Sequence, residues 1–104
     1  MSKHSKNKGA RGEREWAGVL TLNGYPAHRG RQYSGGPNSP DVICPTMPVH
    51  WEVKRVERLN IWSAMDQAKG DCGERLPGVA FRRNHWPWMI CLYAGDFFDL
   101  IRMQ

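Results

Sequence analysis

The sequence predicts an α+β domain in which helices flank a central mixed β-sheet of about five strands. Its 104 residues are enough for one domain and too few for two. Short apolar segments with strand character alternate with segments of helical spacing, and Gly, Pro and Asn clusters separate them. No apolar run approaches the roughly 18 residues of a membrane span, so we expect no membrane partner.

The chain begins with a polar, basic segment, residues 1–9, which we expect to be a flexible arm preceding a single domain of residues 10–104. This start has no apolar stretch typical of a signal peptide, which favours a cytoplasmic protein of a prokaryote or a virus-infected host cell. A helix is predicted from Ala10 to Leu22, because Asn23-Gly24 is a common helix stop.

Glu13 lies on the apolar side of this predicted helix. On a helical wheel, Trp16, Ala17 and Leu20 follow it at +3, +4 and +7, on the same face. A carboxylate that faces a core is costly unless a cation pairs with it or it binds a metal. Glu13 is therefore either a metal ligand or the partner of an Arg or Lys side chain.

The next segments predict an antiparallel hairpin. In chain order they are a strand at Ala27–Tyr33, a loop at Ser34–Pro40, a strand at Asp41–Cys44, a turn at Pro45–Pro48 and a strand at Val49–Lys54. Two strands joined by so short a turn pair as a hairpin.

The second half predicts two more helices and two more strands. The segments are a helix at Ile61–Lys69 capped by Asn60 and ended by Gly70, strands at Gly78–Arg83 and Trp88–Tyr93, and a helix at Asp96–Arg102 capped by Asp96. Residues 84–87 form the turn between the two strands.

Side chains alternate along the Val49–Lys54 strand, so one face carries Val49, Trp51 and Val53. The other face carries His50, Glu52 and Lys54, and we expect it to lie away from the core. Asp41 opens the partner strand. Two carboxylates and one ammonium group therefore converge at one end of the hairpin.

Phosphodiester hydrolysis uses such a set of groups. Mg²⁺ is commonly held by one or two carboxylates together with water and phosphate. A lysine beside the ion can orient the attacking water and stabilise developing negative charge. A Glu-x-Lys triplet alone also fits an ordinary exposed hairpin, but Pro40-Asp41 paired with Glu52-Val53-Lys54 is more specific.

Fifteen Lys and Arg residues against ten Asp and Glu give a net charge of +5. This balance suits a polyanionic partner, although many small domains are basic for solubility. The three cysteines, Cys44, Cys72 and Cys91, match no standard zinc spacing, and buried thiols in strands are the favoured interpretation of Cys44 and Cys91.

Several motifs together resemble the archaeal Holliday junction resolvases, a family of PD-(D/E)xK nucleases, in order and spacing. The matching segments are Lys8–Trp16, Gly24–Arg29, Ser34, Pro40–Ile43 and Trp51–Lys54. The resemblance covers residues 8–54 well, and 78–82 followed by a Trp-rich strand also fits the family. It implies a restriction-endonuclease-like core.

The resemblance implies a catalytic set of Glu13, Asp41, Glu52 and Lys54. Asp41, Glu52, Glu13 and the backbone carbonyl of Val53 would bind Mg²⁺, for which Mn²⁺ would substitute, with no small-molecule cofactor. Gln67 resembles a supporting polar residue of related nucleases, with a helix-surface glutamine as the alternative. The residues implied or expected to contact DNA are Lys8, Arg11, Arg14, Arg29, Arg31, Ser34 and Arg55.

The predicted function is a homodimeric, metal-dependent endonuclease that makes paired nicks in branched DNA during recombination and repair. One alternative is a nuclease that nicks duplex or flapped DNA without junction preference. Another is a non-catalytic DNA-binding protein of the same fold. The aromatic residues after Gly78 exceed what one small core can bury, which favours an apolar subunit interface, with base stacking as a further use.

Overall fold

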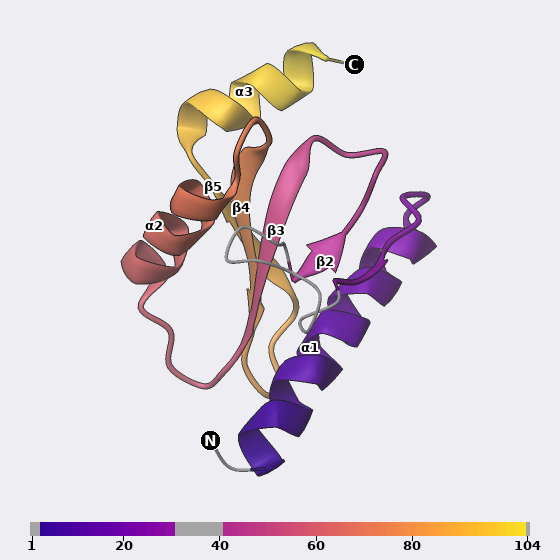
Figure 1. Ribbon diagram of the computed structural model, residues 1–104, viewed down its shortest axis with the longest axis vertical. Helices are drawn as coiled ribbons and strands as arrows, with labels where there is room; N and C mark the ends of the chain where they lie inside the picture. The colour runs from indigo at the N-terminus through magenta and orange to yellow at the C-terminus, as the bar shows by residue number, and fades with distance from the viewer. Residues whose placement is uncertain (1–2, 31–40, 104) are drawn as a thin grey trace.

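The computed structural model describes residues 3–30 and 41–103, with side chains described from residue 9 onward. The elements in chain order are α1 (Lys3–Leu22), β1 (His28–Arg29), β2 (Val42–Ile43), β3 (Val49–Arg55), α2 (Ile61–Asp71), β4 (Leu76–Arg82), β5 (Met89–Leu92) and α3 (Ala94–Arg102). The five strands form one sheet in the order β1-β2-β3-β4-β5 (Figure 1). The predicted α+β class with a mixed sheet is confirmed.

The sheet is mixed because it contains both antiparallel and parallel strand pairs. β2 and β3 pair antiparallel, with Val42 opposite Trp51, which confirms the predicted hairpin. β3 and β4 pair parallel, and α2 makes the crossover between them. β4 and β5 again form an antiparallel pair, joined by a short turn.

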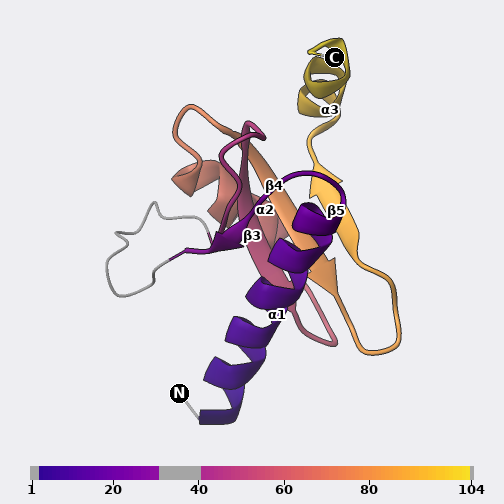
Figure 2. The same ribbon diagram turned by 90° about the vertical axis from the view of Figure 1, so that its right-hand side faces the viewer.

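Two helices cover opposite faces of the sheet (Figures 1 and 2). Trp16, Ala17 and Leu20 of α1 pack in one core cluster with Trp51 and other residues of the sheet. A second cluster joins Ala64, Met65 and Ala68 of α2 to Val79. β3 therefore lies between two layers, and neither of its faces is open to solvent along most of its length.

The close approach of α1 to β3 depends on a glycine. A Cβ atom built on Gly12 would lie 2.6 Å from the Cβ atom of Arg55, a distance that real Cβ atoms do not tolerate. Gly12 therefore lets the helix lie directly on the strand, and the next residue, Glu13, is brought down onto the sheet.

The ends of several elements differ from the sequence predictions. α1 begins at Lys3, seven residues before Ala10, so residues 3–9, expected to form an arm, are helical. Lys, Ser and Asn tolerate helical backbone, and the segment contains no proline to stop it. Gly70 lies inside α2, which continues to Asp71, while the predicted Asn60 cap is confirmed by its bond from the Ser63 amide.

The last helix begins earlier than predicted. α3 starts at Ala94, its N-cap is Tyr93 without a side-chain cap bond, and Asp96 lies in the first turn instead of capping it. A carboxylate there still interacts favourably with the helix dipole. The predicted strand at Ala27–Tyr33 is described only as far as β1, since residues 31–40 lie outside the described chain.

α3 is the least buried helix of the described chain. It extends beyond the end of the sheet (Figure 2), and none of its residues is buried. Phe97, Phe98 and Ile101 are 45%, 53% and 53% exposed. The excess of apolar side chains expected after Gly78 is therefore found at the surface. No helix among the described residues has the length and apolar character needed to cross a membrane.

Candidate functional site

The polar face of β3 is buried, contrary to the sequence prediction. Glu52 is 2% exposed and His50 is also 2% exposed, although both were expected to project away from the core. Glu52 lies opposite Val79 in the parallel β3–β4 pair, on the sheet face that α2 covers. A buried carboxylate needs a partner that offsets its loss of hydration, so the neighbours of Glu52 decide what this face can do.

Asp41 lies beside β3, directly before β2, as predicted. Its backbone amide donates to the Trp51 carbonyl at 3.0 Å, and its Oδ2 accepts from the Val53 amide at 2.9 Å. The carboxylate is therefore held against the middle of β3. These two bonds explain why the hairpin brings Asp41 to the same end as Glu52.

Three acidic groups influence one another here. Burial raises the pKa of Asp41 to about 7, the hydrogen bond from Val53 lowers it in part, and the charges of Glu52 and Glu13 raise it further. Such crowding of carboxylates is unfavourable in the absence of a cation. Glu13, Asp41 and Glu52, which come from α1, the start of β2 and β3, are thus brought into one neighbourhood.

Glu13 has a basic partner. Its side chain is 6% exposed, and its Oε1 accepts a hydrogen bond from Nε of Arg29 at 2.8 Å. The structure thus contains the basic partner that one of the two alternatives for Glu13 requires, and its role as a metal ligand stays a prediction. Arg29, expected at a phosphate, is 33% exposed and contacts the acidic group in this structure.

Lys54 and Gln67 are in contact, which was not predicted from the sequence. The Nζ atom of Lys54 donates to Oε1 of Gln67 at 3.1 Å, which joins β3 to α2. Lys54 pairs with Phe81 across the parallel ladder, on the same sheet face as Glu52. Gln67 therefore holds the ammonium group on the face that carries the carboxylates.

His50 is a site residue that the sequence reasoning did not select. Its Nε2 lies 3.2 Å from Oε1 of Glu52, and the two side chains are each 3% exposed. The strand alternation had already placed His50 on the face of Glu52, so that spacing was the available signal. A histidine in this position orients the carboxylate of Glu52.

The donor set fits a hard divalent cation. Asp41 and Glu52 supply carboxylate oxygens, and the Val53 carbonyl points to the same strand edge as the Val53 amide that binds Asp41. Within residues 3–30 and 41–103, no group of three His, Cys, Asp or Glu side chains is arranged to hold an ion. Two carboxylates and a carbonyl suit Mg²⁺, which retains water and phosphate ligands.

The residues expected to contact DNA have different surroundings. Arg14 is exposed and lines a shallow hollow together with Arg29 and His28. Arg11 is exposed and lies 3.6 Å from Glu15. The side chain of Lys8, and all of Arg31 and Ser34, fall outside what the structure describes.

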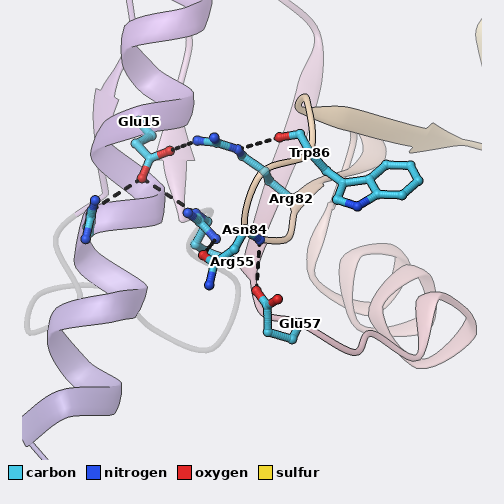
Figure 3. A network of polar contacts seen from close by, with 7 residues as sticks. Glu15, Arg55, Glu57, Arg82, Asn84 and Trp86 are labelled. Atoms are coloured by element: carbon cyan, nitrogen blue, oxygen red, sulfur yellow. Dashed lines mark hydrogen bonds and ion pairs between the residues drawn. The ribbon is translucent and has the colours of Figure 1, made fainter.

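Arg55 does not fit the phosphate contact expected of it. Its side chain is 9% exposed, Nε lies 3.6 Å from Glu15, and Nη1 donates to Asn84 at 2.9 Å. Arg82 also binds Glu15, at 2.7 Å, so one carboxylate of α1 joins β3 and β4 (Figure 3). The network stabilises the packing of α1 and leaves little of Arg55 for a ligand.

The cysteines have no partner thiol in the structure. Cys44 is buried, while Cys72 and Cys91 are partly buried, and all three are free. Cys44 packs in the core cluster under α1, and Cys91 lies in β5 against the cluster under α2. The interpretation of Cys44 as a buried thiol is confirmed.

No protein-family model and no curated protein sequence matches the chain. Among solved structures it is similar to Hjc, a Holliday junction resolvase from the archaeal hyperthermophile Archaeoglobus fulgidus. The TM-score is 0.58 at 21% sequence identity, and the alignment covers 79% of this chain and 73% of that chain. This likeness shows that the chain has an Hjc-like fold.

Proposed function

We propose that this chain is an Mg²⁺-dependent endonuclease that nicks branched DNA at a four-way junction. The observation that carries the proposal is the bond from the Val53 amide to Asp41, which brings the Asp41 carboxylate to a strand carrying Glu52 and Lys54. The Hjc-like fold supports the same conclusion, because the similar structure is that of a Holliday junction resolvase.

Asp41, Glu52 and the Val53 carbonyl would hold the ion, and Glu13 would complete the site or hold a second ion. When bound, the ion supplies an acidified water and neutralises charge on the phosphate. Lys54, oriented by Gln67 at 3.1 Å, stabilises the attacking water and the same developing charge. His50 keeps Glu52 in one orientation through its 3.2 Å contact.

Phosphate binding is assigned to exposed cations near this site. Arg14 and Arg29 border one hollow on the side of α1, and Arg11 is exposed on the same helix. Arg29 would exchange its contact with Glu13 for a phosphate once an ion neutralises the carboxylates. Contacts between arginine side chains and DNA phosphates give affinity without sequence preference.

We further propose that the enzyme acts as a homodimer. A four-way junction has approximate two-fold symmetry, and a C₂ dimer presents two identical sites for two nicks. The exposed Phe97, Phe98 and Ile101 of α3 offer an apolar contact surface. Light scattering at micromolar concentration should report about twice the 11.9 kDa chain mass without DNA. A monomer would count against paired nicking while leaving single nicking possible.

The test of the function is cleavage of a four-way junction and a duplex of matching sequence, with Mg²⁺ and with EDTA. Symmetric nicks in the junction alone, lost in EDTA, are the expected result. Nicks in both substrates would favour the nuclease without junction preference. No cleavage by a folded protein that binds both substrates would favour the non-catalytic alternative.

A further inference from the structure

An apolar pocket of about 260 Å³ lies beside the turn between β4 and β5. Its lining includes the apolar side chains of Val56, Phe81, Trp86 and Met89 and the charged residues Glu57, Arg82 and Arg83. Trp86 and Met89 are 47% and 45% exposed, so the apolar surface is accessible to a ligand.

The pocket lies next to the candidate catalytic lysine. Phe81, one of its walls, is the register partner of Lys54 in the parallel β3–β4 pair. Val56, another wall, follows Lys54 by two residues, a rise of about 7 Å along an extended chain. A nucleic acid strand whose phosphate is at Lys54 would therefore bring a neighbouring nucleotide to this pocket.

The turn that carries Trp86 is held in place by polar contacts (Figure 3). Arg82 Nε donates to the Trp86 carbonyl at 2.6 Å, and the Asn84 amide donates to Glu57 at 2.8 Å. Asn84 also accepts from Arg55, which is anchored by Glu15 of α1. The backbone is fixed from three directions, yet the indole points away from the network and stays exposed.

The chemistry of the surroundings favours an aromatic ligand that carries negative charge nearby. The guanidinium of Arg83 lies 4.3 Å from the Trp86 ring centroid, and an Arg over an indole forms a positively charged platform. The chain as a whole carries a net charge of +5. The pocket is lined by two arginines, Arg82 and Arg83, and one carboxylate, Glu57, so the cations are in excess. Apolar walls, an aromatic ring and an excess of positive charge are features on which single-stranded nucleic acids stack their bases.

We propose that this pocket takes an unstacked nucleobase from the strand whose phosphate is cleaved. The inference rests on the proposed nuclease function and names the feature that selects its substrate. Unstacking a base from an intact duplex costs a few kcal/mol, and the cost is least where the base is mismatched or already single-stranded. A base pair at a branch point lacks the continuous stacking of a duplex interior, so releasing one of its bases costs less and the pocket favours branched DNA over duplex.

The test compares Trp86→Ala and Trp86→Phe with a matched control, Trp62→Ala. Trp62 lies on α2 and is 83% exposed, so its removal controls for the loss of a surface indole. Affinity is measured in EDTA for a four-way junction and for a duplex, at several salt concentrations. A junction with 2-aminopurine at the branch reports stacking of that base by its fluorescence.

Trp86→Ala should weaken junction binding by about tenfold, the range expected for loss of one base–aromatic stack. Duplex affinity and the salt dependence of binding should stay unchanged, because no phosphate contact is removed. Trp86→Phe should retain most of the affinity, and Trp62→Ala should behave as the wild type. The 2-aminopurine signal should change on binding of the wild type and not of Trp86→Ala.

Equal junction affinity for the wild type and Trp86→Ala, while the wild type binds and cuts the junction, would overturn the pocket assignment alone. A wild type that neither binds nor cuts DNA would overturn the proposed function and the pocket assignment together. A fall in oligomeric mass in Trp86→Ala would show that the pocket contacts a second copy of the chain, which also contradicts a nucleobase site.

Discussion

The two faces of β3 are similarly buried but have opposite chemical character. On one face, Trp51 packs edge-to-face against Trp16 of α1, with ring centroids 5.1 Å apart. On the other, His50 and Glu52 lie under α2 at 2% exposure each. Burial of apolar side chains on the first face stabilises the fold. Burial on the second face removes water from a carboxylate, which costs stability unless a partner offsets it. Burial in this strand therefore stabilises the fold on one side and, on the other, holds the carboxylate that is proposed to bind a metal.

The largest expected effect is loss of cleavage in Glu52→Gln. The substitution keeps the side-chain shape and its contact with His50 but removes the charge of a carboxylate that is proposed to bind the metal, so cleavage should fall by at least about a hundredfold. DNA affinity should be unchanged or higher, because a negative charge near the phosphate is lost. Single-turnover kinetics measure the cleavage rate, and a binding isotherm measures the DNA affinity. Cleavage at a near-wild-type rate would contradict the assignment of Glu52 to the active site.

Trp51→Ala should give the largest loss of stability. Removing a buried tryptophan costs about 3–5 kcal/mol, a large part of the stability of a small domain. Urea unfolding measures the change, and Trp62→Ala, at an 83% exposed position, should alter stability by no more than about 0.5 kcal/mol. Equal effects of the two variants would contradict the assignment of the α1 face as the stabilising one.

The stability of the metal-free protein should depend on pH through Asp41. Its pKa rises from an ordinary 3.8 to about 7 in the fold, so folding favours the protonated form. The associated stability is present below pH ~4 and is lost as the pH rises through ~7. Asp41→Asn should remove this part of the pH dependence. If the unfolding free energies of the wild type and of the variant changed equally with pH between pH 4 and pH 8, that result would contradict the raised pKa.

Glu13→Ala should have the smallest effect on folding. Arg29, its partner at 2.8 Å, is 33% exposed and can be hydrated when the carboxylate is removed. The free energy of unfolding should therefore change by about 1 kcal/mol or less. A decrease in the free energy of unfolding of more than about 3 kcal/mol is typical of breaking a fully buried ion pair. That result would show that the Glu13–Arg29 pair stabilises the fold. Cleavage by the folded variant then reports its role at the metal.

Features that depend on neighbouring residues were predicted well from the sequence. The hairpin followed from a four-residue turn, and the Asn60 cap from its place before an amphipathic segment. The convergence of Asp41 with Glu52 then followed from the pairing of two adjacent strands. The resemblance gave Gln67 a supporting role, but its contact with Lys54 was not predicted from the sequence.

Features that depend on distant residues were missed. The burial of His50 and Glu52 requires α2 to cover a face that alternation alone assigns to solvent. Arg55 is removed from the surface by Glu15, which lies forty positions earlier in the chain. Neither packing partner has a local signal in the sequence around the residue it buries.

The central claim is that the polar face of β3 binds a divalent cation, and Mg²⁺-dependent thermal stability tests it most directly. An ion that binds the folded state raises the melting midpoint as its concentration exceeds the dissociation constant. At neutral pH without DNA, Mg²⁺ should raise the midpoint of the wild type and of Lys54→Ala, but not of Glu52→Gln or Asp41→Asn. An equal rise in all four proteins, or none in the wild type, would contradict the claim.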